Sequence, residues 1–141
     1  MTEVLFLEHV DDDLLKFAAV VSRYQGKWVL CRQKDRDLYT VPGGRRKDGE
    51  NIEETARRGL YEGTGAARFR MAPVCVYAVR EGAGSQTYGM LYYAEIQEFF
   101  AAPGGGSERV ASFDALPENL ADPLVQPKLI QRAGKAGFGP A

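Results

Sequence analysis

The sequence has 141 residues, close to the length of one typical domain. Its 18 Lys and Arg against 19 Asp and Glu give a formal net charge of −1, so neither strong nucleic-acid binding nor attraction to an anionic membrane is expected. Hydrophobic residues make up 45% of the chain, which supports a packed core and excludes a disordered or collagen-like protein. We therefore expect a single domain over residues 1–141.

The sequence also predicts a cytoplasmic location without a membrane partner. No apolar stretch approaches the roughly 20 residues needed to cross a bilayer. The N-terminal segment lacks the basic start, apolar run and small-residue cleavage site of a secretory signal. Cys31 and Cys75 are far apart in apolar, strand-like sequence, which is typical of buried, reduced thiols.

The first part of the chain predicts three strands and a sharp bend. Residues 16–24 and 27–34 contain the apolar, strand-like runs at 17–21 and 28–30 and flank a Gln-Gly pair, which predicts a hairpin. A short strand over 38–41 runs into the Pro-Gly-Gly sequence at 42–44, where the proline lacks an N–H donor and the glycines permit positive φ angles. We therefore expect the chain to bend at these two glycines.

A helix is predicted over residues 51–64. Its apolar stripe comprises Ile52, Ala56 and Leu60, which recur every four residues. Asn51 can cap this helix, Glu54 three residues later completes a capping box, and Gly65 is positioned to end it. The rest of the chain predicts strands over 74–79 and 88–96 joined by a looser connection over 80–85, a surface loop over 101–107, a short strand over 109–112 and an amphipathic helix over 124–136.

The loop and helix after residue 43 carry the chemistry. Mg²⁺ prefers hard oxygen ligands and usually shares one or two carboxylates with substrate phosphates. A helix that presents glutamates beside a glycine-rich backbone can provide such a site. Glu54, Arg58 and Glu62 follow one another at i, i+4 spacing, so Arg58 can bridge two carboxylates along one side of the helix.

This segment resembles the Nudix box of the Nudix hydrolase superfamily (MutT type), whose pattern is G-x5-E-x7-R-E-U-x-E-E-x-G-U with U aliphatic. The matching positions are Gly44, Glu50, Arg58, Leu60, Glu62, Gly65 and Ala66. The resemblance covers residues 44–66 in detail, and the order of strands and helices resembles a Nudix domain throughout. It implies an α/β fold, the Nudix α/β/α sandwich, with a mixed β-sheet between the box helix and the C-terminal helix.

The resemblance also implies an activity. It points to a pyrophosphohydrolase that depends on Mg²⁺ (or Mn²⁺) and acts on a nucleoside di- or triphosphate or a related nucleotide derivative. Glu62 would be the main metal ligand and Glu50 would support the metal cluster. Gly43 or Gly44 would contribute a carbonyl oxygen, and Arg58 would hold the glutamates in place.

Two positions depart from the family pattern. Gly59 and Gly63 stand where the pattern has glutamate, so Glu62 alone is left of three carboxylates expected on one helix face. Losing a positioned acid or base typically costs 10²- to 10⁴-fold in rate, so the enzyme is expected to be impaired. The alternative is a catalytically inactive nucleotide-binding or interaction module on the same fold.

Three explanations for the two glycines remain open from sequence. They are engineered or accidental substitutions, the helix frays near its end, or the Gly-x-x-x-Gly pattern creates a groove for a backbone or a ligand. Glu95 or Glu98, by analogy with family members that supply the base from loops, could replace the missing general base. A solvated strand end is the commoner fate of such glutamates.

Basic and aromatic side chains near the box have two interpretations each. Arg45 and Arg46 could bind substrate phosphates together with Gly43 and Gly44, or could be solvated in a polar loop. Trp28, Tyr39 and Tyr77 could stack on a nucleobase, although aromatic side chains in strands mostly join the core.

Overall fold

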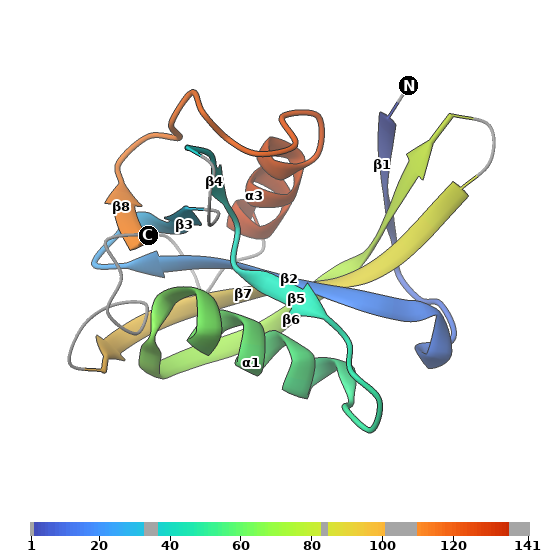
Figure 1. Cartoon of the computed structure of the whole chain (residues 1–141), viewed down its shortest axis with the longest axis horizontal. Helices are drawn as coiled ribbons and strands as arrows, with labels where there is room; N and C mark the ends of the chain where they lie inside the picture. Colours follow the sequence, from blue (N-terminus) through green and yellow to red (C-terminus); the bar gives the residue numbers. More distant parts are fainter. Residues whose placement is uncertain (1, 33–36, 83–84, 101–109, 136–141) are drawn as a thin grey trace.

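The computed structural model describes residues 2–32, 37–82, 85–100 and 110–135, and Figure 1 shows their arrangement. In chain order the elements are β1 (Thr2–Leu7), the 3-10 helix η1 (Asp12–Leu14), β2 (Leu15–Tyr24), β3 (Lys27–Arg32), β4 (Tyr39–Thr40), β5 (Gly43–Arg45), α1 (Ile52–Thr64), β6 (Ala66–Glu81), β7 (Ser85–Phe99), β8 (Val110–Phe113) and α3 (Gln126–Lys135).

The strands form one mixed sheet. Its strand order is β1-β6-β7-β2-β3-β4, with β5 paired to the first half of β2 and β8 paired to β3. The central pair, β2 and β7, is parallel, whereas β1 with β6, β6 with β7 and β2 with β3 are antiparallel. The sheet therefore places β2 beside both β7 and β5, and β5 begins the loop that leads into α1.

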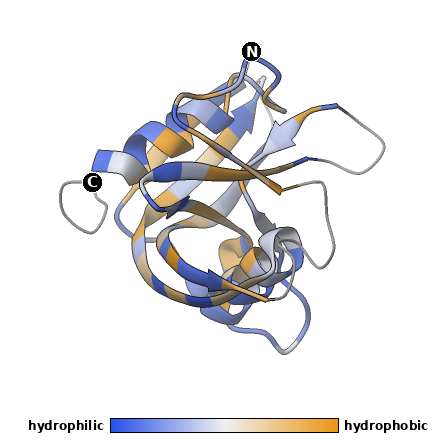
Figure 2. Ribbon diagram, turned by 90° about the vertical axis from the view of Figure 1, so that its left-hand side faces the viewer, coloured by the Kyte–Doolittle hydropathy of each residue, from blue (hydrophilic) through white to orange (hydrophobic). Residues whose placement is uncertain are grey.

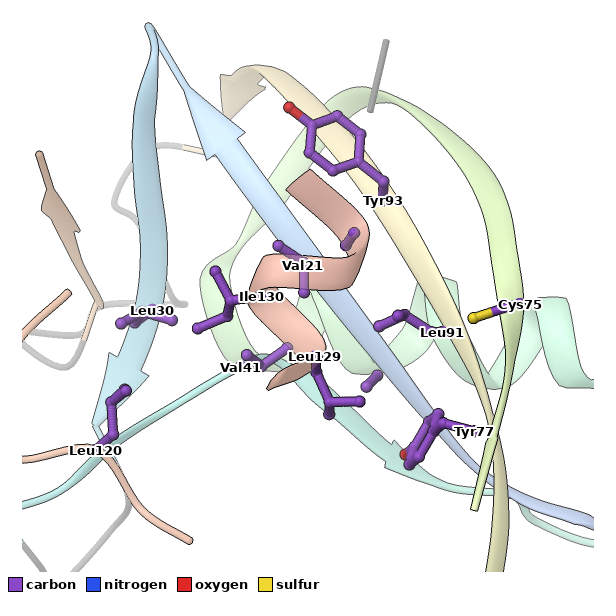
Figure 3. Close-up of a cluster of buried hydrophobic side chains, with 12 residues drawn as sticks. Val21, Leu30, Val41, Cys75, Tyr77, Leu91, Tyr93, Leu120, Leu129 and Ile130 are labelled. Atoms are coloured by element: carbon purple, nitrogen blue, oxygen red, sulfur yellow. The ribbon is translucent and has the colours of Figure 1, made fainter. Parts of the chain in front are cut away.

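Helices α1 and α3 cover opposite faces of the sheet, as the alternation of buried side chains along the strands requires. One cluster joins α3 to the sheet and includes Ala19, Val21, Leu91, Tyr93, Leu129, Ile130 and Ala133. The other joins α1 to the sheet and includes Ala18, Val20, Tyr92, Ala94, Ile96, Ala56 and Leu60. Figure 2 shows the alternation as bands of colour along the strands, and Figure 3 shows Leu129 and Ile130 of α3 inside the first cluster. The predicted α/β/α sandwich is confirmed.

Local signals in the sequence account for the main turns. At the β2–β3 hairpin, Gln25 and Gly26 both have positive φ, the backbone of a tight hairpin turn. At the start of α1, the Asn51 side chain accepts from the Glu54 N–H at 2.8 Å and the Glu54 carboxylate accepts from the Asn51 N–H at 2.9 Å. The helix ends at Gly65, whose φ is 76°. The predicted hairpin, capping box and helix stop are all confirmed.

Other expectations needed correction. No strand was expected before residue 16. The structure has the edge strand β1 there, and it pairs with β6. Strands β6 and β7 are much longer than the predicted 74–79 and 88–96, since each continues well beyond its apolar stretch as a paired ribbon. The predicted loop over 101–107 lies outside the described residues, and so do the last residues of the predicted 27–34 strand and residue 136 of the last helix. A single domain over residues 1–141 stays a prediction.

The two cysteines are free thiols; Cys75 is buried and Cys31 is half-buried. Within the described ranges, no helix is long and apolar enough to cross a membrane.

Candidate functional site

Gly43 and Gly44 lie in strand β5, not in a turn. Gly43 pairs with Ala19 and Gly44 with Ala18, and neither glycine has a positive φ angle. The expectation that these glycines supply positive φ was therefore wrong. Glycine is needed at 43 for close approach instead, because a β-carbon there would collide with the carbonyl oxygen of Ala18.

Glu50 and Arg58 form the best-defined polar contact of the loop and helix. Arg58 Nε donates to Glu50 Oε2 at 2.6 Å and Arg58 Nη2 donates to Glu50 Oε1 at 3.0 Å, so the two side chains form a bidentate salt bridge. The Lys47 N–H and the Thr55 hydroxyl also donate to Oε1, at 3.0 and 2.9 Å. The hydrogen bonds from Arg58 and the Lys47 N–H are the chief reasons that the pKa of Glu50 falls to about 2.

Arg58 also connects the loop to the exposed side of α1. Its Nη2 donates to the Arg45 carbonyl oxygen at 2.7 Å, and its Nη1 donates to Glu62 Oε1 at 3.1 Å. A β-carbon on Gly44 would lie 3.6 Å from Nη1, so Arg58 lies directly against β5. Arg58 therefore bridges Glu50 and Glu62. The expected partner Glu54 is engaged in the capping box instead.

Glu62 lies on the solvent side of this contact. Its side chain is 56% exposed, and Arg58 holds it near Gly44. It is not one of the residues that line the neighbouring cavity. In the part of the chain that the structure describes, no three His, Cys, Asp or Glu side chains gather into a metal-binding group.

The two glycines of α1 have different surroundings. A β-carbon on Gly59 would lie 2.6 Å from the carbonyl carbon of Gly43, a distance that backbone atoms do not tolerate. A β-carbon on Gly63 would lie 3.3 Å from both Cys31 Sγ and Pro42 Cβ, which is tight but does not involve backbone at that distance. Since α1 runs through Thr64, the helix does not fray at Gly63. Of the three explanations left open by the sequence, the close approach of a backbone matches Gly59.

A cavity of about 580 Å³ lies beside these glycines, between β5, the sheet and the start of α3. Gly43, Gly44 and Arg45 form one part of its wall, and Gly63 of α1 reaches it from another side. The remaining lining residues are Phe17, Ala18, Ala19, Cys31, Thr40, Val41, Pro42, Tyr77, Val79, Glu81, Thr87, Asp122, Val125, Gln126 and Leu129. This mixture of apolar wall and few polar groups is typical of small-molecule sites.

The two arginines of the loop have different environments. Arg46 Nε donates to the Glu50 carbonyl at 2.8 Å, its Nη1 donates to the Asp12 carbonyl at 2.8 Å, and its Nη2 pairs with Asp12 Oδ2 at 2.9 Å. Arg45 is exposed and lines the cavity, and within the described residues its side chain makes only a cation–π contact, with its guanidinium carbon 5.8 Å from the centre of the Phe17 ring. Arg45 can therefore meet an anionic ligand, whereas Arg46 holds the loop to η1.

Glu95 and Glu98 lie in a different part of the sheet. Ala19, which pairs with Gly43, pairs on its other side with Leu91, four residues before Glu95 on β7. Glu98 forms an ion pair with Arg68 at 2.9 Å. The structure does not bring either glutamate to the glycines of β5.

Glu81, Asp122 and Gln126 line the cavity but were not candidates from sequence. They stand singly in the sequence, and only the fold brings them to one cavity. Tyr77 had two interpretations from sequence, stacking on a nucleobase or a place in the core. It belongs to the core cluster on the α3 face and also lines the cavity.

A resident metal ion does not fit this donor set. Glu50 already accepts hydrogen bonds from Arg58, Lys47 and Thr55. Of the three helix positions where the family pattern has glutamate, Glu62 alone is left, because positions 59 and 63 are glycine. Two such side chains do not enclose a resident Mg²⁺ by themselves, since Mg²⁺ on one or two carboxylates takes its other ligands from waters and substrate phosphates.

Comparison with known proteins places these features in a family. The model of the NUDIX domain matches residues 14–128. YtkD of Bacillus subtilis (strain 168), provisionally named an 8-oxo-dGTP diphosphatase, is 32% identical over 114 residues, which are 77% of this chain and 68% of that protein.

Solved structures share the fold. A mutant of the Bacillus subtilis pyrophosphohydrolase BsRppH has a TM-score of 0.72 at 24% identity, covering 97% of this chain and 92% of that one. A NUDIX hydrolase from Nitrosomonas europaea has a TM-score of 0.66 at 18% identity, covering 86% of this chain and 90% of that one. The NUDIX domain of Shewanella oneidensis NrtR, solved with ADP-ribose, has a TM-score of 0.65 at 20% identity, covering 86% and 87%.

Proposed function

This chain belongs to the NUDIX domain family, and we propose that it is a hydrolase of phosphoric anhydrides with low turnover. Its substrate is a nucleoside di- or triphosphate or a related nucleotide derivative. The observation that carries this proposal is the position of the Gly44–Arg45 backbone. It lies at once against Arg58, which holds Glu62, and in the wall of the cavity.

The proposed roles follow from these contacts. Arg45 binds a substrate phosphate, since its guanidinium is exposed at the cavity wall and charge-assisted hydrogen bonds to phosphate are strong. Arg58 and Glu50 are positioning residues that hold the loop against the helix. Water attacks a phosphorus atom of the anhydride, the bond to the bridging oxygen breaks, and the released phosphate group leaves with that electron pair.

A divalent cation enters this proposal as part of the substrate. The family is generally dependent on divalent metal, yet Glu50 and Glu62 do not make a resident site. Mg²⁺ commonly binds nucleotide phosphates while keeping several waters and only one or two protein carboxylates. We propose that the substrate is the Mg²⁺ (or Mn²⁺) complex of the nucleotide. Glu62 then offers an exposed carboxylate, which Arg58 holds beside β5.

Low turnover is part of the proposal. The position that would carry a second carboxylate, residue 59, is glycine packed against Gly43. Glu95 and Glu98 lie elsewhere on the sheet and do not replace it. The general base is therefore bulk water or buffer, which forfeits the gain that a positioned base supplies.

A second candidate function is nucleotide binding without hydrolysis. The contact between Gly59 and Gly43 favours it, because this geometry leaves no room for a catalytic side chain on that turn of the helix. ADP-ribose bound to the NUDIX domain of NrtR is an example of a nucleotide derivative held by this fold.

One experiment separates the two functions. Calorimetric titration of nucleotides with and without Mg²⁺ measures binding, and chromatography of the same samples after incubation measures hydrolysis. Products that accumulate in proportion to protein concentration support the hydrolase. Binding that is independent of Mg²⁺ and leaves the nucleotide intact contradicts the hydrolase and supports the binding module.

We also propose that the protein is cytoplasmic. Cys31 and Cys75 are free thiols, which persist in reducing compartments, where nucleotides also abound. Fractionation of cells with an antibody to the protein tests this proposal.

A further inference from the structure

Thr55 of α1 is a buried residue whose hydroxyl group reaches a residue outside the helix. It is 0% exposed. Its Oγ1 lies 2.9 Å from Glu50 Oε1 and 3.2 Å from the Asn51 carbonyl oxygen. A threonine inside a helix often donates to the carbonyl oxygen four residues earlier, and the contact with Glu50 goes beyond that ordinary role.

The proton of the Thr55 hydroxyl points to Glu50. A hydroxyl group has one proton to donate, and hydrogen bonds to a charged acceptor are stronger than those to a neutral one. The contact with the Glu50 carboxylate is also the shorter of the two. The Asn51 carbonyl oxygen accepts from the Thr55 N–H at 3.1 Å, so it is satisfied without the hydroxyl.

Thr55 ties the Glu50 carboxylate to the body of the helix through a short side chain. Arg58 reaches the same carboxylate through a long side chain with many rotamers, whereas a β-branched side chain has few. The Lys47 N–H, the remaining donor, belongs to the same loop as Glu50. The contact with Thr55 therefore fixes Glu50 relative to the axis of α1, and α1 also carries Glu62.

The guanidinium of Arg58 passes the position of Glu50 on to Glu62. Nε and Nη2 of Arg58 donate to the two oxygens of Glu50, and Nη1 donates to Glu62 Oε1 at 3.1 Å. Because a guanidinium is planar and rigid, a rotation of the Glu50 carboxylate also displaces Nη1. Among the described residues, only Arg58 bonds to the Glu62 carboxylate, so Glu62 moves with Nη1.

We propose that Thr55 is a positioning residue for hydrolysis, and this proposal rests on the proposed function. Its hydroxyl fixes the Glu50 carboxylate, which fixes the guanidinium of Arg58, and Arg58 holds Glu62 beside β5, where the substrate complex binds. Thr55 is not among the residues that line the cavity, so it does not touch the substrate. It acts on the rate of hydrolysis through Glu62.

Steady-state kinetics of threonine variants test the proposal. Thr55→Val removes the hydroxyl and keeps the branched shape and a similar helix propensity. With Mg²⁺ and the nucleoside triphosphate that the wild-type protein hydrolyses fastest, we expect kcat to fall about three- to tenfold and KM to change less than about twofold, since small displacements of a reacting group mainly cost rate. Thr55→Ser keeps the hydroxyl and should retain kcat within about twofold of wild type.

Thr64→Val is the matched control. Thr64 is also 0% exposed on α1, but its hydroxyl donates to the Leu60 carbonyl oxygen at 2.7 Å and accepts from the Ala66 N–H at 3.1 Å. This variant should lower the melting temperature and keep the kcat of the wild-type protein. If Thr55→Val does not fold, Thr55→Ala removes the hydroxyl without adding a methyl group to a packed site, and the same fall in kcat is expected.

A double variant shows whether Thr55 acts through Glu62. Thr55→Val should slow the wild-type protein but not Glu62→Gln, because the carboxylate that Thr55 positions is already absent from the second background. Equal slowing in both backgrounds means that Thr55 affects the rate by another route, and this result overturns the proposal.

The remaining outcomes separate this proposal from the proposed function. If the wild-type protein hydrolyses nucleotides, three results each overturn the positioning role and leave the proposed function standing: a wild-type kcat in Thr55→Val, an equal loss of kcat in Thr64→Val, or no recovery in Thr55→Ser. If the wild-type protein forms no product above a protein-free sample, the proposed function fails and the positioning role fails with it.

Discussion

Gly59 of α1 lies so close to Gly43 of β5 that a β-carbon on Gly59 would be 2.6 Å from the Gly43 carbonyl carbon and 2.8 Å from its Cα. The helix and the strand therefore meet backbone to backbone. Glycine inside a helix is unfavourable by roughly 1 kcal/mol relative to alanine. The close packing of α1 against β5 explains why position 59 is glycine despite this cost.

Gly59→Ala should lower the free energy of unfolding by about 1–3 kcal/mol, because the added methyl group forces α1 and β5 apart. Gly63→Ala, the same change one turn later, should shift stability by less than about 1 kcal/mol. Its new β-carbon meets Cys31 Sγ and Pro42 Cβ at 3.3 Å, and its gain in helix propensity offsets part of that cost. Urea denaturation measures both. A Gly59→Ala protein as stable as wild type would show that the backbones separate easily.

Gly63→Glu should raise the rate of hydrolysis. It should destabilise the fold less than a double replacement at 59 and 63, since of these two positions only 63 has space for a side chain after small shifts. It adds a carboxylate next to Glu62 at the edge of the cavity, so a nucleotide-bound Mg²⁺ gains a second protein oxygen. We expect the rate to rise about tenfold or more, equivalent to ~1.4 kcal/mol in the barrier. Gly63→Gln has nearly the same size without the charge, and an equal rise in that variant would refute the electrostatic reason.

Much of the fold could be predicted because its signals are local. The turn at Gln25 and Gly26, the capping box at Asn51 and the stop at Gly65 each depend on a few adjacent residues. The spacing of residues 44–66 was specific enough to identify the family. The edge strand β1 and the full lengths of β6 and β7 depend on pairing between distant segments, which periodicity does not record.

The candidate site was predictable only in part, for the same reason. The pairing of Arg58 with Glu62 follows from helical spacing, but its stronger contact with Glu50 depends on how the loop folds back. No local pattern shows that Gly59 packs on Gly43. Gln126 is separated from Val41 by 85 positions, so only the folded chain shows that its amide is fixed.

The ion pair of Glu50 predicts a pH dependence of stability. The pKa of Glu50 is about 2 in the folded protein against an ordinary value of 4.5, mainly because of the hydrogen bonds from Arg58. A lowered folded pKa stabilises the protein above the unfolded pKa, and this stabilisation disappears as the pH falls from about 4.5 to about 2.

Unfolding curves measured across this range should therefore converge for wild type and Glu50→Gln as the pH falls, with wild type more stable at neutral pH. Glu53→Gln, in an exposed ion pair with Arg57 on the same helix, serves as control. Curves for wild type and Glu50→Gln that stay parallel from neutral pH down to pH 2 would mean that the pair contributes nothing through its charge.

The two adjacent arginines should separate binding from stability. Arg45→Met should weaken nucleotide binding about tenfold, more at low salt than at high salt, without changing the melting temperature, because Arg45 has no ion pair among the described residues. Arg46→Met should lower stability by about 1–3 kcal/mol, since it removes hydrogen bonds to the Glu50 and Asp12 carbonyls. Calorimetric titration and thermal denaturation of both variants check this. Lower stability in Arg45→Met together with weaker nucleotide binding in Arg46→Met would contradict this assignment.

The rate of anhydride hydrolysis in matched helix variants tests the proposed function most directly. Glu62 and Glu53 are both exposed, 56% and 59%, and each pairs with an arginine four residues away on α1. With Mg²⁺ and ATP, GTP, CTP or UTP, wild type should form product slowly but above a protein-free sample for at least one nucleotide. Glu62→Gln should be about tenfold slower or more, and Glu53→Gln unchanged. Product at the protein-free rate with all four nucleotides, or equal rates in the two variants, would contradict a hydrolase that depends on Glu62.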